Sequence, residues 1–383
     1  MLSLRVETPS DQSEHHVGDV LACQYTTDGK FILSAGWDGS LRIWDASDGV
    51  SVQELQVSSK PLTVCMKDPK GKSWWMANMD GMLIQWDPEK ECEQSMFLAH
   101  TRPVSSLCFS PDGNEFVTAS WDSNISVWHR GDSVDGKIMG KHGDIVAGCQ
   151  YSPDGKMLVS WSFDGTSAIW DMTTYTPIYQ LFGHNERATA GAISPDGNWY
   201  LSGARDGEIK LWDVNSGDEI CSLMMTSEIA RCFFLLDMKS VVVVDVGGRI
   251  TRHTFPDLNK VEEVILGAPV LCGCYSPQGS QLAFGSSDGA VHLVTIDKFD
   301  SVPLAVTAKP SIRVTATALQ RLFGQSTSTT VYQLTCPVCC YSFEIPGEKG
   351  NEDILCRRCR RYLKIYAITE MSEPTFGIGI GVR

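Results

Sequence analysis

The sequence predicts an all-β protein in which a seven-bladed β-propeller is followed by a small cysteine-rich module. Three observations support this prediction. Turn motifs recur at a nearly constant spacing, short alternating polar and apolar runs separate them, and two pairs of cysteines lie close together near the C-terminus. Apolar residues make up 43% of the 383 residues, which is enough for a sizeable core.

The repeat is marked by turns that carry Asp-Gly or a related pair. Four steps of 42 residues and two steps of 41 residues separate the marker positions. These positions are Asp38, Asp80, Asp122, Asp164, Asp206, Gly247 and Asp288. A period of about 40–45 residues with Trp-Asp near the end of each unit is typical of a propeller blade, which is a four-stranded sheet.

Within each unit, runs such as "LACQYT" and "LRIWDA" have the alternation of a half-buried strand, and segments such as "TDGK" suit tight turns. A blade needs neighbours on both faces, so the last blade must be closed by a strand from the other terminus. Residues 2–8 ("LSLRVET") and 302–308 ("VPLAVTA") are both candidates, and the pattern does not decide between them. We predict a propeller over 1–308, a linker over 309–330, a compact module over 331–369 and a Gly-rich tail over 370–383.

These units resemble the WD-repeat family, and the resemblance covers nearly all of residues 1–308. In that family a His, a Ser or Thr, the turn Asp and a Trp of one blade bond to one another, which pairs a buried carboxylate with donors. Four units of this sequence match with identical offsets of 18, 4 and 6 residues. The sets are His16, Ser34, Asp38, Trp44; His100, Thr118, Asp122, Trp128; His142, Ser160, Asp164, Trp170; and His184, Ser202, Asp206, Trp212.

Three units depart from the pattern but keep its phase. The second has Ser58 and Met76 where the family has His and Ser. The sixth has Gly247 and His253 in place of Asp and Trp, and the seventh has Val294 in place of Trp. The resemblance therefore implies seven blades, of which the sixth is the least regular.

The position just before the turn Asp is a candidate contact site, because the resemblance places it on an exposed face near the central channel. Large apolar residues there are unusual and suggest a binding patch. Arg187, in the loop after His184, adds a positive charge near this position. The predicted partner-binding residues are Trp37, Met79, Trp121, Phe163, Arg187 and Arg205. The alternative is that these side chains fold down onto neighbouring blades as packing.

The C-terminal module contains two Cys-x-x-Cys pairs with 16 residues between them. Four thiolates at this spacing, with strands before and after each pair, are typical of a zinc ribbon, and such a small module needs the metal to fold. We predict one structural Zn²⁺ bound by Cys336, Cys339, Cys356 and Cys359. Two disulfides are the alternative, and an intracellular protein disfavours them. Of the 14 cysteines, the nine in the propeller are mostly expected to be small buried apolar residues.

Charge is unevenly distributed along the chain. The net charge is −14, but residues 311–383 carry +3 and the preceding residues carry −17. The whole molecule is therefore too acidic for general nucleic-acid binding. The ribbon is locally basic, which suits an acidic protein or a nucleic acid, and the alternative is an ordinary solvated surface. These basic residues are Arg357, Arg358, Arg360, Arg361 and Lys364.

No catalytic motif stands out in the sequence, so we do not expect an enzyme. There is also no apolar run long enough for a membrane span and no secretory signal, and we expect a cytoplasmic protein without a membrane partner. The function predicted is a non-enzymatic scaffold or adaptor that binds one or more proteins in a multi-component complex. The alternative is a nucleic-acid-associated adaptor that uses the basic ribbon.

Overall fold

The computed structural model describes residues 3–7, 15–71, 73–90, 92–130 and 135–297 of the larger part of the chain. It also describes the strand backbones at 306–315, 327–335, 342–346, 353–355, 362–367 and 376–379. Contacts divide the chain into two units, residues 2–297 and residues 298–383. Each unit is described separately below.

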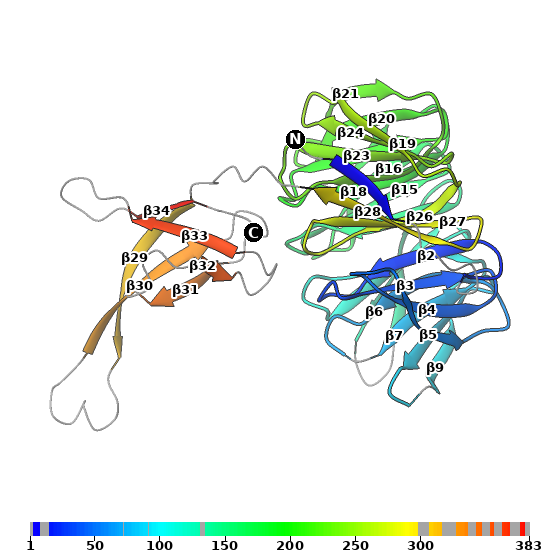
Figure 1. Ribbon diagram of the computed structural model, residues 1–383, viewed down its shortest axis with the longest axis horizontal. Coiled ribbons are helices and arrows are strands. Elements are labelled where there is room, and N and C mark those ends of the chain that lie inside the picture. Colours follow the sequence, from blue (N-terminus) through cyan, green and yellow to red (C-terminus); the bar gives the residue numbers. More distant parts are fainter. Residues whose placement is uncertain are drawn as a thin grey trace. The chain divides into compact units, whose positions relative to one another are not determined.

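The first unit consists of seven four-stranded antiparallel sheets in chain order, as the repeat predicts (Figure 1). Blades one and two contain β2 (Val20–Tyr25), β3 (Phe31–Gly36), β4 (Ser40–Asp45), β5 (Ser51–Gln56), β6 (Leu62–Lys67), β7 (Trp74–Asn78), β8 (Met82–Asp87) and β9 (Cys92–Leu98). Blades three and four contain β10 (Val104–Phe109), β11 (Glu115–Ser120), β12 (Asn124–His129), β13 (Asp135–Lys141), β14 (Val146–Tyr151), β15 (Met157–Ser162), β16 (Thr166–Asp171) and β17 (Thr176–Phe182).

Blades five and six contain β18 (Ala188–Ile193), β19 (Trp199–Ala204), β20 (Glu208–Asp213), β21 (Glu219–Met224), β22 (Ile229–Phe234), β23 (Ser240–Asp245), β24 (Arg249–Thr254) and β25 (Lys260–Ile265). Blade seven contains β26 (Val270–Tyr275), β27 (Gln281–Ser286), β28 (Val291–Asp297) and β1 (Ser3–Glu7). All seven blades have a register shift near the start of their first strand, for example between Val20 and Ala22. The irregular second, sixth and seventh units are therefore genuine blades.

The N-terminal strand closes the ring. β1 pairs antiparallel with β28, with Ser3 opposite Asp297 and Glu7 opposite Leu293, and Figure 1 shows the two strands side by side. This decides the question that the sequence left open. The competing segment contributes residues 306–308 to the sheet of the second unit instead.

The core is divided among the contacts between neighbouring blades. Seven clusters of buried apolar residues each join two successive blades, so the described propeller has one cluster for every interface in the ring. The cluster that joins blades seven and one contains Val20 and Trp44 from one side and Cys272 and Leu293 from the other. The ring is thus held by apolar packing between sheets rather than by one central core.

Six of the nine propeller cysteines are buried, which agrees with their predicted role as small apolar residues. Several thiols also contact a carbonyl oxygen of the preceding blade. Cys65 Sγ lies 3.7 Å from Leu33 O, and Cys232 Sγ lies 3.6 Å from Leu201 O. Burial raises the pKa of Cys65 and Cys232, so these thiols stay protonated and serve packing.

The turn after the second strand requires a left-handed residue in every blade. Six blades have glycine there, and blade three has Ser123 with φ of 69°. A Cβ on Gly39 would collide with the carbonyl oxygen of Ser58, because the next loop lies directly over the turn. The Asp-Gly spacing that revealed the repeat therefore reflects a backbone requirement.

The second unit contains one six-stranded sheet in the order β31-β30-β29-β34-β33-β32. Its strands are β29 (Val306–Thr315), β30 (Thr327–Thr335), β31 (Ser342–Pro346), β32 (Asp353–Leu355), β33 (Tyr362–Ala367) and β34 (Phe376–Gly379). This sheet extends beyond the segment that we predicted as a ribbon. β29 begins in the last three residues of the predicted propeller and continues into the predicted linker, which also contains part of β30, and β34 lies in the predicted tail. Long-range strand pairing gives these segments partners that their composition does not reveal.

In the described part of the chain, no helix is long and apolar enough to cross a membrane.

Candidate functional site

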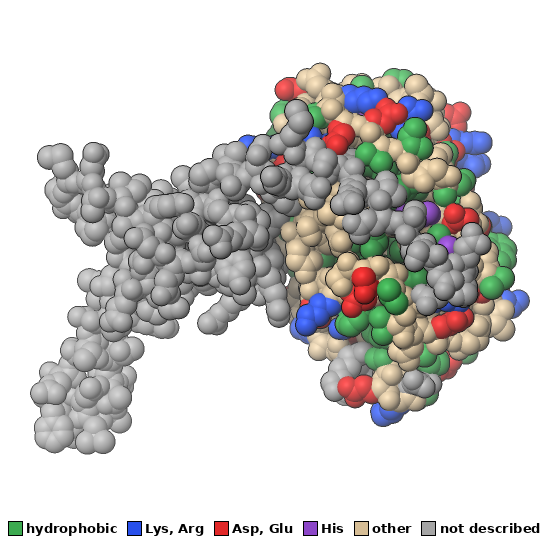
Figure 2. Space-filling model, in the orientation of Figure 1, with side chains coloured by type: hydrophobic (Ala, Val, Ile, Leu, Met, Phe, Trp, Pro, Cys, Tyr) green, Lys and Arg blue, Asp and Glu red, His purple; other side chains and the backbone are tan. Residues whose placement is uncertain are grey.

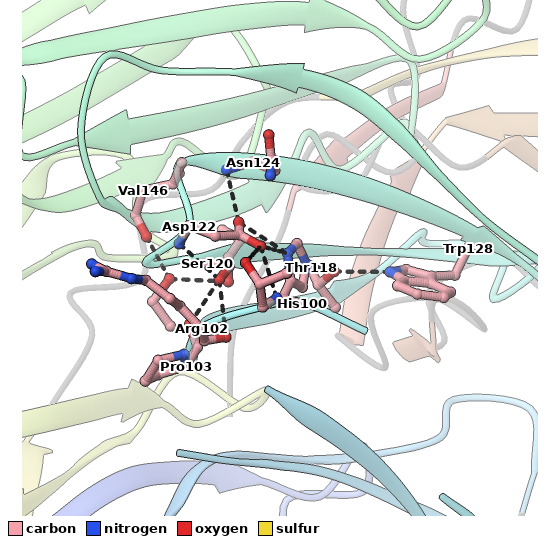
Figure 3. Close-up of polar contacts among 12 residues, drawn as sticks. His100, Arg102, Pro103, Thr118, Ser120, Asp122, Asn124, Trp128 and Val146 are labelled. Atoms are coloured by element: carbon pink, nitrogen blue, oxygen red, sulfur yellow. Dashed lines mark hydrogen bonds and ion pairs between the residues drawn. The ribbon is translucent and has the colours of Figure 1, made fainter. Parts of the chain in front are cut away.

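Blade three shows the polar network that holds the turn in place (Figure 3). Trp128 Nε1 donates to Thr118 Oγ1 over 2.8 Å, and the same hydroxyl lies 2.8 Å from His100 Nε2. The other ring nitrogen of His100 lies 3.1 Å from Asp122 Oδ2. Asp122 also accepts from the backbone N–H of Asn124 over 3.0 Å. One buried chain of contacts thus connects the blade interior to the surface turn.

Burial tends to raise the pKa of the turn carboxylates, but the hydrogen-bond donors around them lower it by more. For Asp38, burial alone would raise the pKa, but hydrogen bonds from His16 and Ser40 outweigh it and hold the pKa well below its usual range. Asp122 and Asp164 show a lowered pKa for the same balance of causes. The ionised form of these carboxylates is therefore favoured and bonded to donors within the blade, which suits a role in holding the turn.

Blades one and four repeat the arrangement. In blade one, His16 Nδ1 lies 3.1 Å from Asp38, and Trp44 Nε1 donates to Ser34 over 2.7 Å. In blade four, His142 Nδ1 lies 3.6 Å from Asp164 and 3.1 Å from the hydroxyl of Thr166. The three sets assigned from spacing are therefore confirmed as connected networks.

The fourth set, in blade five, is only partly connected. Trp212, Ser202 and His184 are joined by contacts of 2.8 and 2.7 Å, but Asp206 forms no hydrogen bond with His184. The residue two positions after the turn Asp differs. Blades one and four have a hydroxyl there that donates to the turn Asp, whereas blade five has Glu208, whose side-chain carboxylate cannot donate to Asp206 and repels its charge.

The irregular blades use substitutes that the spacing did not reveal. In blade two, Asn78 accepts from the backbone of Asp80 and Met82, while Trp86 Nε1 has no hydrogen-bond partner because Met76 replaces the serine. In blade six, Asp245 supports the turn in place of the missing turn aspartate and accepts a hydrogen bond from the backbone N–H of Arg249 over 2.9 Å.

In blade seven, a histidine on the third strand of the blade contacts the serine at the end of the second strand. His292 Nε2 lies 3.0 Å from Ser286 Oγ, and this hydroxyl also contacts Asp288. In blade six the residue at the Trp position, His253, instead contacts Thr251 within the same strand. Asn78, Asp245 and Ser286 all occupy the last position of the second strand, and polar residues at that position were the available signal.

The positions before the turn are equivalent in all seven blades. The backbone N–H of each donates to a carbonyl oxygen in the loop that enters the same blade, over 2.8–3.2 Å. These residues are Trp37, Met79, Trp121, Phe163, Arg205, Val246 and Ser287. The bond of Val246 to Glu228 fixes the phase of blade six, which the sequence left uncertain. We call the end of the ring that carries these turns the top face.

The side chains at these positions differ in exposure. Trp37 is 53% exposed and Trp121 is 41% exposed, whereas Met79 and Phe163 are partly buried. The Arg187 guanidinium lies over the Phe163 ring, 5.1 Å from its centroid. Arg205 is exposed and lies 3.8 Å from Glu228. The prediction of an exposed position therefore holds most clearly for the two tryptophans.

Two further residues belong near this surface but were not singled out from the sequence. Val17 follows the network histidine of blade one and is 78% exposed, next in space to the turn that carries Trp37. Trp161 occupies a position that is alanine in blades one to three, and Gly148 and Gly191 leave room for its ring. The small residues opposite Trp161 were the signal for it.

The predicted zinc ligands Cys336, Cys339, Cys356 and Cys359 lie outside the described residues, as do Arg357, Arg358, Arg360 and Arg361. Lys364 lies in β33, where only the backbone is described. In the described residues, one group of side chains has the composition and spacing of a metal site: His184, Asp206 and Glu208. It is the incomplete network of blade five.

The WD domain, G-beta repeat family model matches residues 8–45, 90–129, 136–171 and 175–213. Each matched segment contains one complete set of His, Ser or Thr, Asp and Trp. These four segments are WD40 repeats. The blades outside the matched segments are the second, sixth and seventh, which are those where the WD40 residues are replaced. No curated protein matches the chain.

The turn aspartates of this WD40 propeller should differ in their contribution to stability. Asp164→Ala removes the acceptor for Gly143 N–H, Thr166 N–H and the Thr166 hydroxyl, so we expect a loss of about 1–3 kcal/mol in the free energy of unfolding. Asp206→Ala removes one backbone bond from an exposed carboxylate and should cost less. Denaturant unfolding of both variants, with Asp288→Ala as a third, measures the difference. Equal losses for Asp164→Ala and Asp206→Ala would contradict this account.

The buried histidines should make the protein sensitive to acid. Burial lowers the pKa of His100, His142, His184, His253 and His292. As the pH falls below the unfolded pKa of about 6.5, the unfolded chain therefore binds more protons than the native protein, and stability is lost until the pH reaches the lower native pKa values. We expect the melting temperature to fall between about pH 7.5 and about pH 5.5, as thermal melts can show. A constant or rising melting temperature would contradict this, because neutralising an acidic protein relieves charge repulsion.

Proposed function

We propose that the chain is a non-enzymatic cytoplasmic scaffold that binds protein partners through the top face of its WD40 propeller and through a C-terminal zinc ribbon. WD40 propellers commonly serve as interaction scaffolds, and the rigid ring suits that role because its turns are fixed by buried networks. The identity of the binding surface rests on one observation. Two tryptophans at equivalent turn positions stay exposed.

The exposure of Trp37 and Trp121 is significant because the scaffold does not need it. Ser287 fills the equivalent position in blade seven with the same backbone bond, so a small polar residue supports the turn equally well. An exposed indole leaves apolar area in water, at about 25 cal/mol per Å². Aromatic side chains of this kind are enriched among the residues that dominate protein interfaces.

Charge around the tryptophans is mixed. Arg187 and Arg205 add cations on the side of blades four and five, and Glu228 is close to Arg205. On the face of the propeller seen in Figure 2, acidic, basic and apolar side chains are interspersed. A surface of this kind fits a folded protein or a peptide with apolar anchors better than a polyanion.

Trp37 and Trp44 should respond differently to replacement by alanine. Trp44 is 1% exposed and bonded to Ser34, so Trp44→Ala should cost about 3–5 kcal/mol of stability. Trp37→Ala should change stability by less than about 1 kcal/mol. It should weaken partner binding by about 2 kcal/mol or more, as truncating a central aromatic anchor commonly does. Thermal melts and titration with an isolated partner measure the two effects.

The partner is found by affinity purification with mass spectrometry, comparing the wild type with a Trp37→Ala/Trp121→Ala variant. Phe182→Ala is the matched control, because it removes an exposed aromatic ring from the outer strand β17. Partners of the top face are those retained by the control and lost by the double variant. Equal sets of partners for both variants, or a destabilised Trp37→Ala protein, would refute this part of the proposal.

The zinc ribbon is proposed from the cysteine spacing together with the neighbouring strands. β30 and β31 pair as far as Thr335 and Ser342, and β32 and β33 pair as far as Leu355 and Tyr362. Each cysteine pair therefore lies in a connection of six residues between antiparallel strands. Directions alternate across the sheet order, so both connections start from the same end of the sheet, at its two opposite edges. The support for a shared metal is the hairpin around each Cys-x-x-Cys pair together with the spacing of the pairs.

Cys356→Ser should lower the zinc content of the purified protein by about one ion per chain, because it removes one of four thiolate ligands. The melting transition of the propeller should stay nearly unchanged, since its core lies within residues 2–297. Elemental analysis and calorimetry provide the two measurements. Cys340→Ser is the matched control and should keep its zinc. Retention of the ion by Cys356→Ser would show that the ligand set is wrong.

A second function, association with RNA or DNA, is favoured by one observation, the five basic residues that lie within or follow the second cysteine pair. Binding of a nucleic acid that weakens steeply with salt, and that is lost when Arg357 and Arg358 are replaced by glutamine, would support it.

A further inference from the structure

The WD40 network of blade five contains an additional carboxylate where the connected networks of blades one, three and four have a neutral group. Two residues after the turn Asp, blades one, three and four have Ser40, Asn124 and Thr166. The hydroxyls of Ser40 and Thr166 each lie 3.1 Å from the histidine Nδ1 and also donate to the turn Asp. Blade five has Glu208 at this position. Two acidic groups therefore surround one imidazole.

His184 is held firmly but its network is incomplete. Its side chain is only 2% exposed, and Nε2 is fixed 2.7 Å from Ser202 Oγ. Nδ1 is buried and has no hydrogen-bond partner, with Glu208 Oε2 at 3.5 Å. The Nδ1 atom and one oxygen from each of Asp206 and Glu208 lie within 4.8 Å of one another. A buried nitrogen thus points into a cluster of carboxylate oxygens.

The positive charge of Lys210 lies close to this cluster and would repel a bound cation. Its ammonium lies 3.0 Å from Glu208 Oε1 and 2.9 Å from Glu219 Oε2. The other oxygen of Glu208 is the one that faces His184, so both interactions can coexist. Asp206, Glu208 and Glu219 together carry three negative charges against the one positive charge of Lys210, which leaves two for a divalent ion to neutralise.

We propose that His184, Asp206 and Glu208 form a divalent transition-metal site at the top face of blade five, with Zn²⁺ as the fitting ion. One imidazole nitrogen and two carboxylate oxygens are ligands that zinc accepts, and a fourth position stays open for water or a donor from a partner. Imidazole disfavours Mg²⁺ and Ca²⁺, which take oxygen ligands.

The three ligand atoms need to move only a short distance toward one another to bind the ion. Metal–ligand distances of about 2.1 Å bring tetrahedral ligand atoms to about 3.4 Å from one another, so the present spacing of up to 4.8 Å must shorten by at most about 1.4 Å. Asp206 is exposed, and its carboxylate accepts the Glu208 N–H at 2.9 Å, a bond within the same turn. Its side chain can therefore move toward a bound ion while His184 stays fixed.

The experiment compares the full-length wild type with Glu208→Thr, which introduces the residue type that blade four has at this position and so preserves the fold. After equilibration in a zinc buffer, the wild type should hold about one more Zn²⁺ per chain than Glu208→Thr. Added Zn²⁺ should raise the melting temperature of the wild type but not of Glu208→Thr. Glu186→Gln, which removes an exposed charge from the loop after His184, is the matched control and should behave as the wild type.

The site is independent of the proposed ribbon, and the experiment separates them. In a Cys356→Ser background, adding Glu208→Thr should still lower the zinc content by about one ion per chain, as expected for separate sites. If the ribbon binds no zinc, the zinc content of Cys356→Ser and of Cys356→Ser/Glu208→Thr changes by the same amount. The difference between these two proteins, which reports the site in blade five, then stays the same.

Two outcomes would overturn the site in blade five. One is equal zinc content and equal thermal shifts for the wild type and Glu208→Thr. The other is loss of the ion in Glu186→Gln as well, because it would indicate attraction by diffuse charge rather than binding by these ligands.

Discussion

The structure depends on one constraint: a four-stranded blade has two apolar faces and can bury them only against its neighbours. The seven clusters between blades meet this need, and the last of them exists only if blade seven is held against blade one. β1 secures that contact by completing the sheet of blade seven from the other end of the chain. Closure therefore ties the stability of every blade to that of the ring.

The buried networks transmit this rigidity to the top face. The indole ring of Trp128 packs in the cluster between blades two and three and bonds to Thr118, which contacts His100, and the imidazole in turn holds the turn carboxylate of Asp122. The residue just before that carboxylate is anchored by a backbone bond alone, so its side chain is free to vary. The same geometry thus presents tryptophan in blades one and three and serine in blade seven.

Much of the fold could be predicted from the sequence because its turns require particular residues. The left-handed position after Asp38 selects glycine, and the network selects His, Ser or Thr, Asp and Trp at fixed offsets, so both leave a period in the chain. The closing strand left no such signal, since edge pairing of β1 needs only an extended segment. Spacing also could not show that His292 reaches Ser286 from a different strand, or that Asp206 is separated from His184. Those outcomes depend on side-chain contacts across strands.

The departures from the repeat follow a physical logic of their own. Where the histidine and its acceptor are both replaced, as in blade two, a residue from the end of the second strand supports the turn, and the cost is an indole N–H without a partner. Blade five is different, because it keeps the histidine and adds a carboxylate. Glu208 gains an ion pair with Lys210, but it leaves the buried Nδ1 of His184 without the contact that a hydroxyl at the same position provides in blade four. The departure in blade five therefore leaves a buried nitrogen facing two carboxylates, and it lies on the same face as the exposed tryptophans.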